Sequence, residues 1–225
     1  MEHNYKSYAF FDVDNTLIKI KSMFSFLEFI EKEAKPTVTI NPQAKENFLA
    51  LAKQNQDRNL ANKVYYQLFK GIEVSLFYRL AQQWADRQRE GIASLLLENT
   101  VKRLQEHKNN GTGVIFVSGS FPELLAPFME ALDADGCLAT KIEEFDGVLT
   151  GEIDAPQTIG EGKAVAVRTF LAEQNVSPEQ CFAYGDDISD APMLHAVGTA
   201  TAIIGNPLLE QEADKYHWKK LHAQL

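Results

Sequence analysis

The sequence predicts an α/β fold in which a doubly wound parallel sheet carries a second, helical domain. Short apolar runs of strand length alternate with segments of helix length, as in parallel sheets with right-handed crossovers. Between the first two of these runs, the amphipathic segments contain no convincing strand. We therefore predict a core domain formed by residues 1–17 and 99–225, and a helical domain formed by residues 18–98.

The stretch from Tyr8 to Val13 predicts the first strand. Its aromatic and apolar side chains suit a strand that is buried on both faces of a parallel sheet. Carboxylates do not suit such a strand, so Asp12 and Asp14 are expected at its C-terminal end, where open α/β sheets bind ligands. The two acids fit either an Asp/Asn turn, or a nucleophile and a second acid that share a metal ion.

The segment after this strand is predicted to be helical. Met23, Phe26, Leu27 and Ile30 repeat with helical spacing, and Ser22 is available as an N-cap. Further amphipathic segments cover approximately residues 44–54, 59–70, 73–88 and 91–108.

The sequence also indicates which side chains of these and later helices lie in the core and which lie on the surface. One apolar stripe should lie in the core, and it consists of Phe77, Leu80, Ala81 and Trp84. Several charged residues are expected on solvated surface, among them Lys53, Arg58, Arg79, Glu161 and Arg168.

The second half of the chain continues the alternation of strands and helices. We expect strands over 114–117, 138–140, 181–184 and 199–203, a hairpin over 144–153, and helices over 121–131, 160–174 and 191–196. Pro122 suits the first turn of its helix, where the missing N–H does no harm, and Asp146-Gly147 is a hairpin turn signal.

The composition and the net charge of the chain argue against several classes of binding partner. The 225 residues carry a formal net charge of −9 without a run rich in Lys and Arg, which argues against nucleic acid as a partner. The two cysteines, Cys137 and Cys181, predict neither a zinc site nor a disulfide framework. Without an apolar run of membrane-spanning length or a signal-peptide pattern, we expect a cytoplasmic protein that makes no membrane contact. The sequence predicts no oligomeric state.

Three of the predicted strands end in polar clusters. These clusters are Asp12 with Asp14, Ser118 with Gly119, and Asp186 with Asp187 and Asp190. Because parallel strands point the same way, the clusters meet at one edge of the sheet. Five acids at such close range repel one another unless a cation neutralises them, and their hard oxygen ligands favour Mg²⁺.

Ser118 and Lys163 suit an anionic substrate at this edge. Ser118 and the N–H groups after it lie at a helix N-terminus, a natural seat for a phosphate. Lys163 lies in the first turn of another helix, where the dipole disfavours a cation unless it faces a phosphate or a carboxylate. Taken singly, Ser118 and Asp190 also fit helix caps, and Lys163 a solvated lysine. These separate explanations do not account for the placement of all three residues near the same strand ends.

Four motifs, in this order, resemble the haloacid dehalogenase (HAD) phosphohydrolase superfamily. They are Asp12-Val13-Asp14-Asn15-Thr16, which matches its D-x-D-x-T/V motif, Ser118 after an apolar strand, Lys163, and Gly185-Asp186-Asp187-Ile188-Ser189-Asp190. The helical insertion looks like the cap domain of the phosphoserine phosphatase-like branch, subfamily IB. The resemblance covers nearly the whole chain and implies a Rossmann-like core.

The resemblance implies a Mg²⁺-dependent phosphatase that hydrolyses a small-molecule phosphate monoester. Asp12 would be the nucleophile that forms an aspartyl-phosphate, and Asp14 the general acid and base. Asp12, the Asp14 carbonyl and Asp186 would bind the metal ion. Asp187 and Asp190 would support these ligands without binding the ion themselves.

The implied substrate contacts include a departure from the family pattern. Ser118, the Gly119 amide and Lys163 would hold the phosphoryl oxygens. In phosphoserine phosphatases a glutamate in the loop after the first motif binds the substrate's ammonium group, and Lys21 occupies that place here. A cation there repels an amino group and welcomes a second anion, which argues against phosphoserine. Asp187 stands where that branch usually has a small neutral residue.

Two alternative functions stay open. A phosphotransferase would keep the covalent step at Asp12 but pass the phosphoryl group to an alcohol acceptor. A catalytically inactive HAD-like binding protein would not need the reactive groups, so the presence of Asp12, Asp14, Lys163 and Asp186 argues against it.

Overall fold

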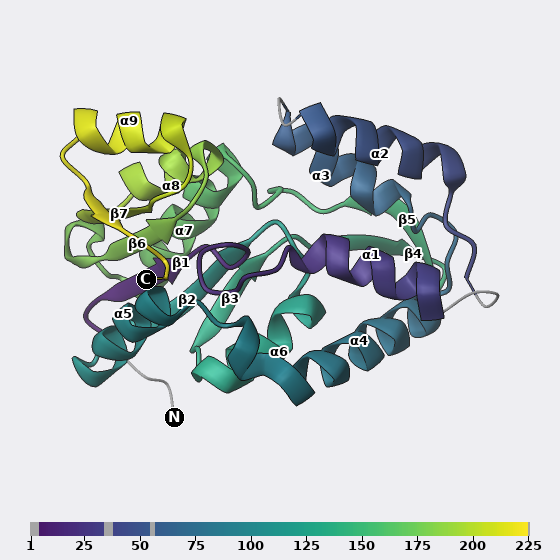
Figure 1. Cartoon of the computed structure of the whole chain (residues 1–225), viewed down its shortest axis with the longest axis horizontal. Helices are drawn as coiled ribbons and strands as arrows, with labels where there is room; N and C mark the ends of the chain where they lie inside the picture. Colours follow the sequence, from purple (N-terminus) through teal and green to yellow (C-terminus); the bar gives the residue numbers. More distant parts are fainter. Residues whose placement is uncertain (1–4, 34–37, 55–56, 225) are drawn as a thin grey trace.

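The computed structural model describes residues 5–33, 38–54 and 57–224, and Figure 1 shows an α/β arrangement around one parallel sheet. Its strand order is β3-β2-β1-β6-β7-β8. These strands are β1 (Tyr8–Phe11), β2 (Gly113–Ser118), β3 (Gly136–Ala139), β6 (Phe182–Gly185), β7 (Thr199–Ile203) and β8 (Lys219–Leu221). The order reverses between β1 and β6, so the predicted doubly wound parallel sheet is confirmed.

Strand β1 lies in the middle of the sheet and is buried on both faces. Phe11 belongs to the hydrophobic cluster that includes side chains of α5 (Glu98–Asn109) and α6 (Pro122–Leu132). Phe10 points to the opposite face, where the cluster includes side chains of α7 (Glu161–Gln174), α8 (Ala191–His195) and α9 (Pro207–Lys215). This double burial explains why the sequence of β1 is apolar without alternation.

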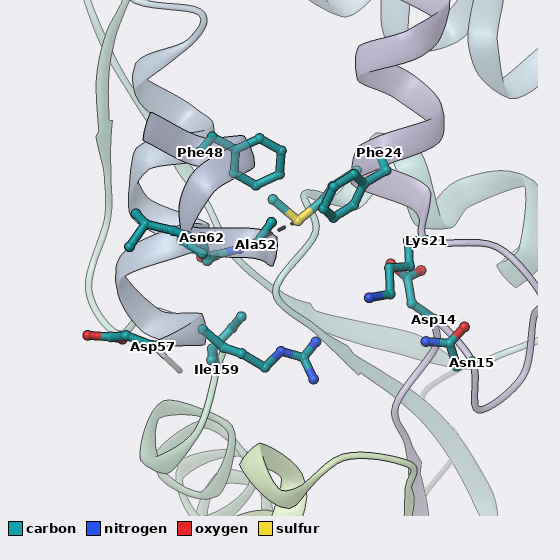
Figure 2. A pocket seen from close by; sticks show the side chains of 13 residues that line it. Asp14, Asn15, Lys21, Phe24, Phe48, Ala52, Asp57, Asn62 and Ile159 are labelled. Atoms are coloured by element: carbon teal, nitrogen blue, oxygen red, sulfur yellow. Dashed lines mark hydrogen bonds between the residues drawn. The ribbon is translucent and has the colours of Figure 1, made fainter. Parts of the chain in front are cut away.

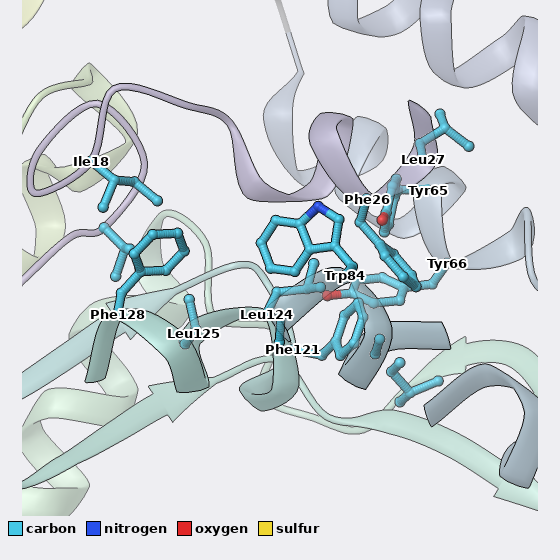
Figure 3. Close-up of a cluster of buried hydrophobic side chains, with 14 of the residues drawn as sticks. Ile18, Phe26, Leu27, Tyr65, Tyr66, Trp84, Phe121, Leu124, Leu125 and Phe128 are labelled. Carbon is cyan, nitrogen blue, oxygen red and sulfur yellow. The ribbon is translucent and has the colours of Figure 1, made fainter. Parts of the chain in front are cut away.

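The helical insertion lies between β1 and β2 in the chain. It consists of α1 (Ser22–Glu33), α2 (Pro42–Gln54), α3 (Arg58–Gln67) and α4 (Val74–Leu95). The predicted stripe on α4 is confirmed as core, since each of its four side chains is at most 6% exposed. Figure 3 shows that Trp84 and Phe26 gather with Phe121, the N-cap residue of α6, and with Phe128 on α6, so the insertion packs directly on this core helix.

The antiparallel hairpin of β4 (Ile142–Phe145) and β5 (Val148–Ile153) lies beside the insertion, although it belongs to the predicted core segment (Figure 1). Backbone hydrogen bonds join Gly71 and Ile72 to Leu149, and Val74 to Gly147. The insertion is therefore fixed to the rest of the chain at α6 and at this hairpin.

Several elements differ from the sequence expectation. Helix α4 continues to Leu95 through a kink at Gly91, where the sequence pattern indicates a break between two segments. Helix α9 and the short edge strand β8 lie in a region for which we predict no helix or strand from the sequence. Among the described residues, no helix combines the length and the apolar character that are needed to cross a bilayer.

His107 on α5 is a half-buried titratable group. Its Nε2 lies 2.8 Å from the Tyr184 hydroxyl. Burial lowers the pKa of His107 to about 4, and this effect is larger than the influence of the nearby charges of Glu106, Lys219 and Arg103. Since an unfolded histidine has a pKa of about 6.5, the unfolded chain binds more protons between these two values.

We therefore expect the protein to lose stability as the pH falls from about 6.5 to about 4. Replacing His107 with Gln removes the titrating group and should reduce this loss of stability by about 1 kcal/mol. We expect no larger value, because partial contact with solvent weakens the effect of burial on the His107 pKa. Urea unfolding of the wild type and H107Q at pH 7.5 and 5 measures the difference. The exposed His222 gives the control H222Q, and an equal pH response in H107Q and the wild type would contradict this account.

Candidate functional site

The topology of the sheet brings the predicted site residues to one edge. Asp12 follows β1, and its backbone N–H donates to the Tyr184 carbonyl of the neighbouring strand β6 at 2.9 Å. Asp186 follows β6, while Ser118 ends β2 on the other side of β1. Asp12 therefore lies between the other two strand ends, at the point where the strand order reverses.

Lys163 lies between two carboxylates. Its Nζ donates to Asp12 Oδ1 at 2.5 Å and to Asp190 Oδ1 at 2.7 Å, and the lysine is only 4% exposed. Burial by itself lowers the pKa of Lys163, but the Asp12 and Asp190 carboxylates together raise it. Lys163 is thus a fixed cation directly beside Asp12, and the alternative of a solvated surface lysine is wrong.

Asp190 shapes the loop that follows β6. Its Oδ2 accepts the backbone N–H groups of Asp186 at 3.1 Å and Asp187 at 3.2 Å. A Cβ at Gly185 would lie 2.5 Å from the Asp190 Cβ, so this close approach requires glycine. Asp190 is the N-cap residue of α8, as one alternative predicts, but its side chain makes no capping hydrogen bond to that helix.

Asp12, Asp186 and Asp190 form a candidate metal centre. One carboxylate oxygen from each of them lies within 4.8 Å of the others. Burial, followed by the charge of Asp12, raises the pKa of Asp186, so this acid retains its negative charge poorly without a compensating cation. Thr16 donates its hydroxyl to Asp186 Oδ1 at 3.3 Å. An all-oxygen donor set of this kind suits Mg²⁺.

The Asp14 carboxylate is not one of these three groups. Its Oδ2 accepts the backbone N–H of Ser22 at 2.9 Å and the Ser22 hydroxyl at 3.0 Å, and that hydroxyl lies 2.6 Å from Ser120 Oγ. Ser22 is the first residue of α1, so Asp14 binds the helix N-terminus and the expectation of Ser22 as N-cap is wrong.

The second oxygen of Asp14 is available for chemistry. Oδ1 is buried and has no hydrogen-bond partner among the described residues. Burial, and to a lesser degree the charge of Asp12, raises the pKa of Asp14 to about 7. The structure thus separates the roles of the two acids in the first motif, since Asp12 contacts a fixed cation and Asp14 has a free oxygen.

The Ser118-Gly119 turn is held by the helical insertion. The Ser118 hydroxyl accepts the backbone N–H of Ser120 at 3.1 Å. The Gly119 carbonyl accepts hydrogen bonds from Asn62 Nδ2 at 2.9 Å and from the Tyr66 hydroxyl at 2.7 Å, both on α3. Helix α6 has Phe121 as its N-cap residue, so Ser118 is not its cap. The insertion therefore positions a turn that the sequence predicts to bind phosphate.

A second link between the insertion and the core is an ion pair. Arg58 at the start of α3 lies 2.8 Å from Asp187 Oδ1, and Asp187 Oδ2 accepts a hydrogen bond from Asn206 Nδ2 at 2.8 Å. Asp187 thus faces the insertion and not the other acids. Arg58 is exposed, as expected, but the sequence does not predict its pairing with Asp187. Arg168 lies exposed in a pair with Glu161.

A cavity of about 90 Å³ lies between the first motif, α1 and the helices α2 and α3 (Figure 2). Its lining consists of Asp14, Asn15, Lys21, Met23, Phe24, Phe48, Leu51, Ala52, Asp57, Arg58, Ala61, Asn62 and Ile159. Lys21 is exposed here and makes no ion pair with any described residue, while its Nζ lies 5.7 Å from the centre of the Phe24 ring. Lys21 and Asp14 thus line the same cavity.

Sequence reasoning missed several residues of this site. The sequence indicates only a cap role for Ser22 and only a surface position for Arg58, and it contains no signal for Asn62 or Asn206. The contacts of Arg58 and Asn62 join segments that are 57 or more positions apart in the chain. No local pattern in the sequence signals such contacts.

Comparison with known proteins gives relatives that are longer than this chain. The chain is 29% identical over 216 residues to a probable phosphatase of Mycobacterium tuberculosis, Rv3661, covering 95% of this chain and 74% of the relative. It is 32% identical over 217 residues to a phosphoserine phosphatase of the same organism, SerB1, with coverages of 94% and 69%.

Solved structures show the same fold at lower identity. A protein of unknown function from Bordetella pertussis matches with a TM-score of 0.80 at 21% identity, covering 97% of this chain and 99% of the other. A substrate-bound phosphoserine phosphatase matches with a TM-score of 0.67 at 19% identity, with coverages of 96% and 92%. The profile of haloacid dehalogenase-like hydrolases matches residues 9–195. This chain therefore belongs to the haloacid dehalogenase-like hydrolase family.

Proposed function

We propose that the protein is a Mg²⁺-dependent phosphatase that hydrolyses a small-molecule phosphate monoester through an aspartyl-phosphate on Asp12. The observation that carries this proposal is the buried pair of Lys163 and Asp12 beside the acids Asp186 and Asp190. The names of the relatives, a probable phosphatase and a phosphoserine phosphatase, support it.

Each reacting residue has a distinct role in this proposal. The Asp12 carboxylate attacks phosphorus, and the bond from phosphorus to the alcohol oxygen breaks as that oxygen takes a proton from Asp14. Asp14 then removes a proton from a water that attacks the aspartyl-phosphate, which releases inorganic phosphate and restores Asp12. The free Oδ1 of Asp14 supports its role as the acid and base.

The remaining groups compensate negative charge. Lys163 pairs with Asp12 and binds a phosphoryl oxygen, together with the Ser118 hydroxyl and the Gly119 amide. Asp12, Asp186 and the Asp14 carbonyl would hold Mg²⁺, which supplies the positive charge that lets a carboxylate approach a phosphate. Asp190 fixes Lys163 and the loop of Asp186. No contact among the described residues favours transfer to an alcohol acceptor over hydrolysis.

Replacing Asp12 with Asn should abolish turnover of p-nitrophenyl phosphate, with a loss of ~1,000-fold or more, because the amide is no nucleophile. Steady-state release of nitrophenol in the presence of Mg²⁺ measures the effect, and circular dichroism checks the fold. The matched control is D146N in the exposed hairpin turn, where the positive φ of 49° suits Asn. Wild-type activity in D12N would refute the proposed mechanism.

Mg²⁺ should stabilise the metal-free protein, because an ion that binds the folded state shifts the unfolding equilibrium. We expect the thermal midpoint to rise by a few degrees in millimolar Mg²⁺, and this rise to be largely lost in D186N. The exposed Asp214 gives the control D214N, which should respond like the wild type. An unchanged response in D186N would mean that the ion binds elsewhere.

Replacing Lys21 with Glu should reverse the charge preference of the cavity. O-phosphoserine and 3-phosphoglycerate form a matched pair, since an amino group in one stands where the other has a hydroxyl. We expect the wild type to favour phosphoglycerate, and K21E to move the ratio of kcat/KM values about tenfold toward phosphoserine. The exposed Lys19 does not line the cavity, so K19E is the control. Equal ratios in all three proteins would exclude Lys21 from substrate selection.

A further inference from the structure

The cavity next to Asp14 has two chemically different ends. Figure 2 shows Asp14 and Asn15 at one end, and the rings of Phe24 on α1 and Phe48 on α2 at the other. The centres of these two rings are 5.0 Å apart. Met23, Leu51 and Ala52 complete the apolar end, so both α1 and α2 contribute to its walls.

Packing of the insertion explains only a part of these apolar side chains. Phe48 is buried and its ring also contacts Tyr65, so it belongs to the core of the insertion. Phe24 is 37% exposed, and Met23, Leu51 and Ala52 are each only half-buried. The apolar surface of these four side chains is in contact with water, which is unfavourable in free energy. A ligand that covers this surface removes it from water.

The polar groups around the cavity are mostly engaged with the protein. Arg58 is paired with Asp187, and the Asn62 side chain bonds to the Gly119 carbonyl and accepts a hydrogen bond from Gln157. Lys21 is the exception among the described lining cations. The Asp57 carboxylate accepts the backbone N–H of Leu60, and Asn62 Nδ2 also lies 3.5 Å from the Met23 sulfur. A hydroxyl or an ammonium group at the apolar end therefore finds few free polar partners among the described residues, and the unpaired Lys21 nearby repels a cation.

We propose that the substrate is a phosphate monoester whose alcohol carries a small apolar body, a single ring or a short branched chain, without a positive charge. This inference rests on the proposed function. With phosphorus next to Asp12 and the ester oxygen next to Asp14, the body of the alcohol packs against Met23, Phe24, Phe48, Leu51 and Ala52.

The test compares esters of primary alcohols, whose leaving groups differ little in basicity. The probes are ethyl phosphate, 2-phenylethyl phosphate and O-phosphoserine, each with Mg²⁺. We expect kcat/KM for 2-phenylethyl phosphate to exceed the values for the other two at least tenfold. Because the ethyl and phenylethyl esters share the reacting atoms, their ratio reports contact with the apolar body.

Variants on α2 localise this contact. Ala52→Phe fills the apolar end and Leu51→Ser makes it polar, so each should lower the ratio of phenylethyl to ethyl ester about tenfold. Leu49 lies on the same helix, is 43% exposed and does not line the cavity, so L49F and L49S are matched controls that should keep the wild-type ratio. Circular dichroism identifies a variant that does not fold, and the other variant then decides.

The outcomes separate this inference from the function on which it rests. Equal kcat/KM values for the three esters, or a preference for O-phosphoserine, would overturn the apolar body and leave the phosphatase in place. A wild-type ratio in a folded A52F or L51S would also overturn it. Failure of the wild type to hydrolyse any of these esters or p-nitrophenyl phosphate would overturn the proposed function, and the inference with it.

Discussion

The buried ammonium of Lys163 is the interaction on which the rest of the site depends. Removing one partner of a buried ion pair leaves an uncompensated charge that costs about 3–5 kcal/mol, so Asp12, Lys163 and Asp190 constrain one another. Lys163 is in the first turn of α7, where the helix dipole opposes a cation, and two carboxylates outweigh that effect. Asp190 in turn fixes the loop of Asp186. One cation thus sets the positions of three acids.

The insertion contributes to the geometry of the catalytic edge as well as covering it. Helix α3 holds the Gly119 carbonyl through Asn62 and Tyr66, and holds Asp187 through Arg58. These contacts reach two loops that follow different strands of the sheet. A displacement of α3 would therefore disturb both the proposed phosphate seat and the loop next to the acids. This coupling explains why polar residues of a predicted cap are buried against the core.

Much of the fold and of the acidic centre could be predicted, because their signals are local. The run of β1 is apolar on both faces, and each acid directly follows a strand, so chain order and parallel topology suffice to bring Asp12 and Asp186 together. The contacts of Arg58 and Ser22 could not be predicted, since they depend on how α3 and α1 dock. The edge strand β8 lacked a signal because its Lys-Lys-Leu sequence is short and exposed.

Chemistry and substrate choice come from different parts of this chain. The groups proposed to react with phosphate lie at the C-terminal ends of the core strands and on α7, whereas the apolar end of the cavity belongs to α1 and α2. Asp14 joins the two parts, because it lines the cavity and also binds the first residue of α1 through Ser22. A side chain on α1 or α2 can therefore change without moving Asp12 or Lys163. It follows that substrate preference can diverge between relatives of this fold while the acids and the lysine stay in place.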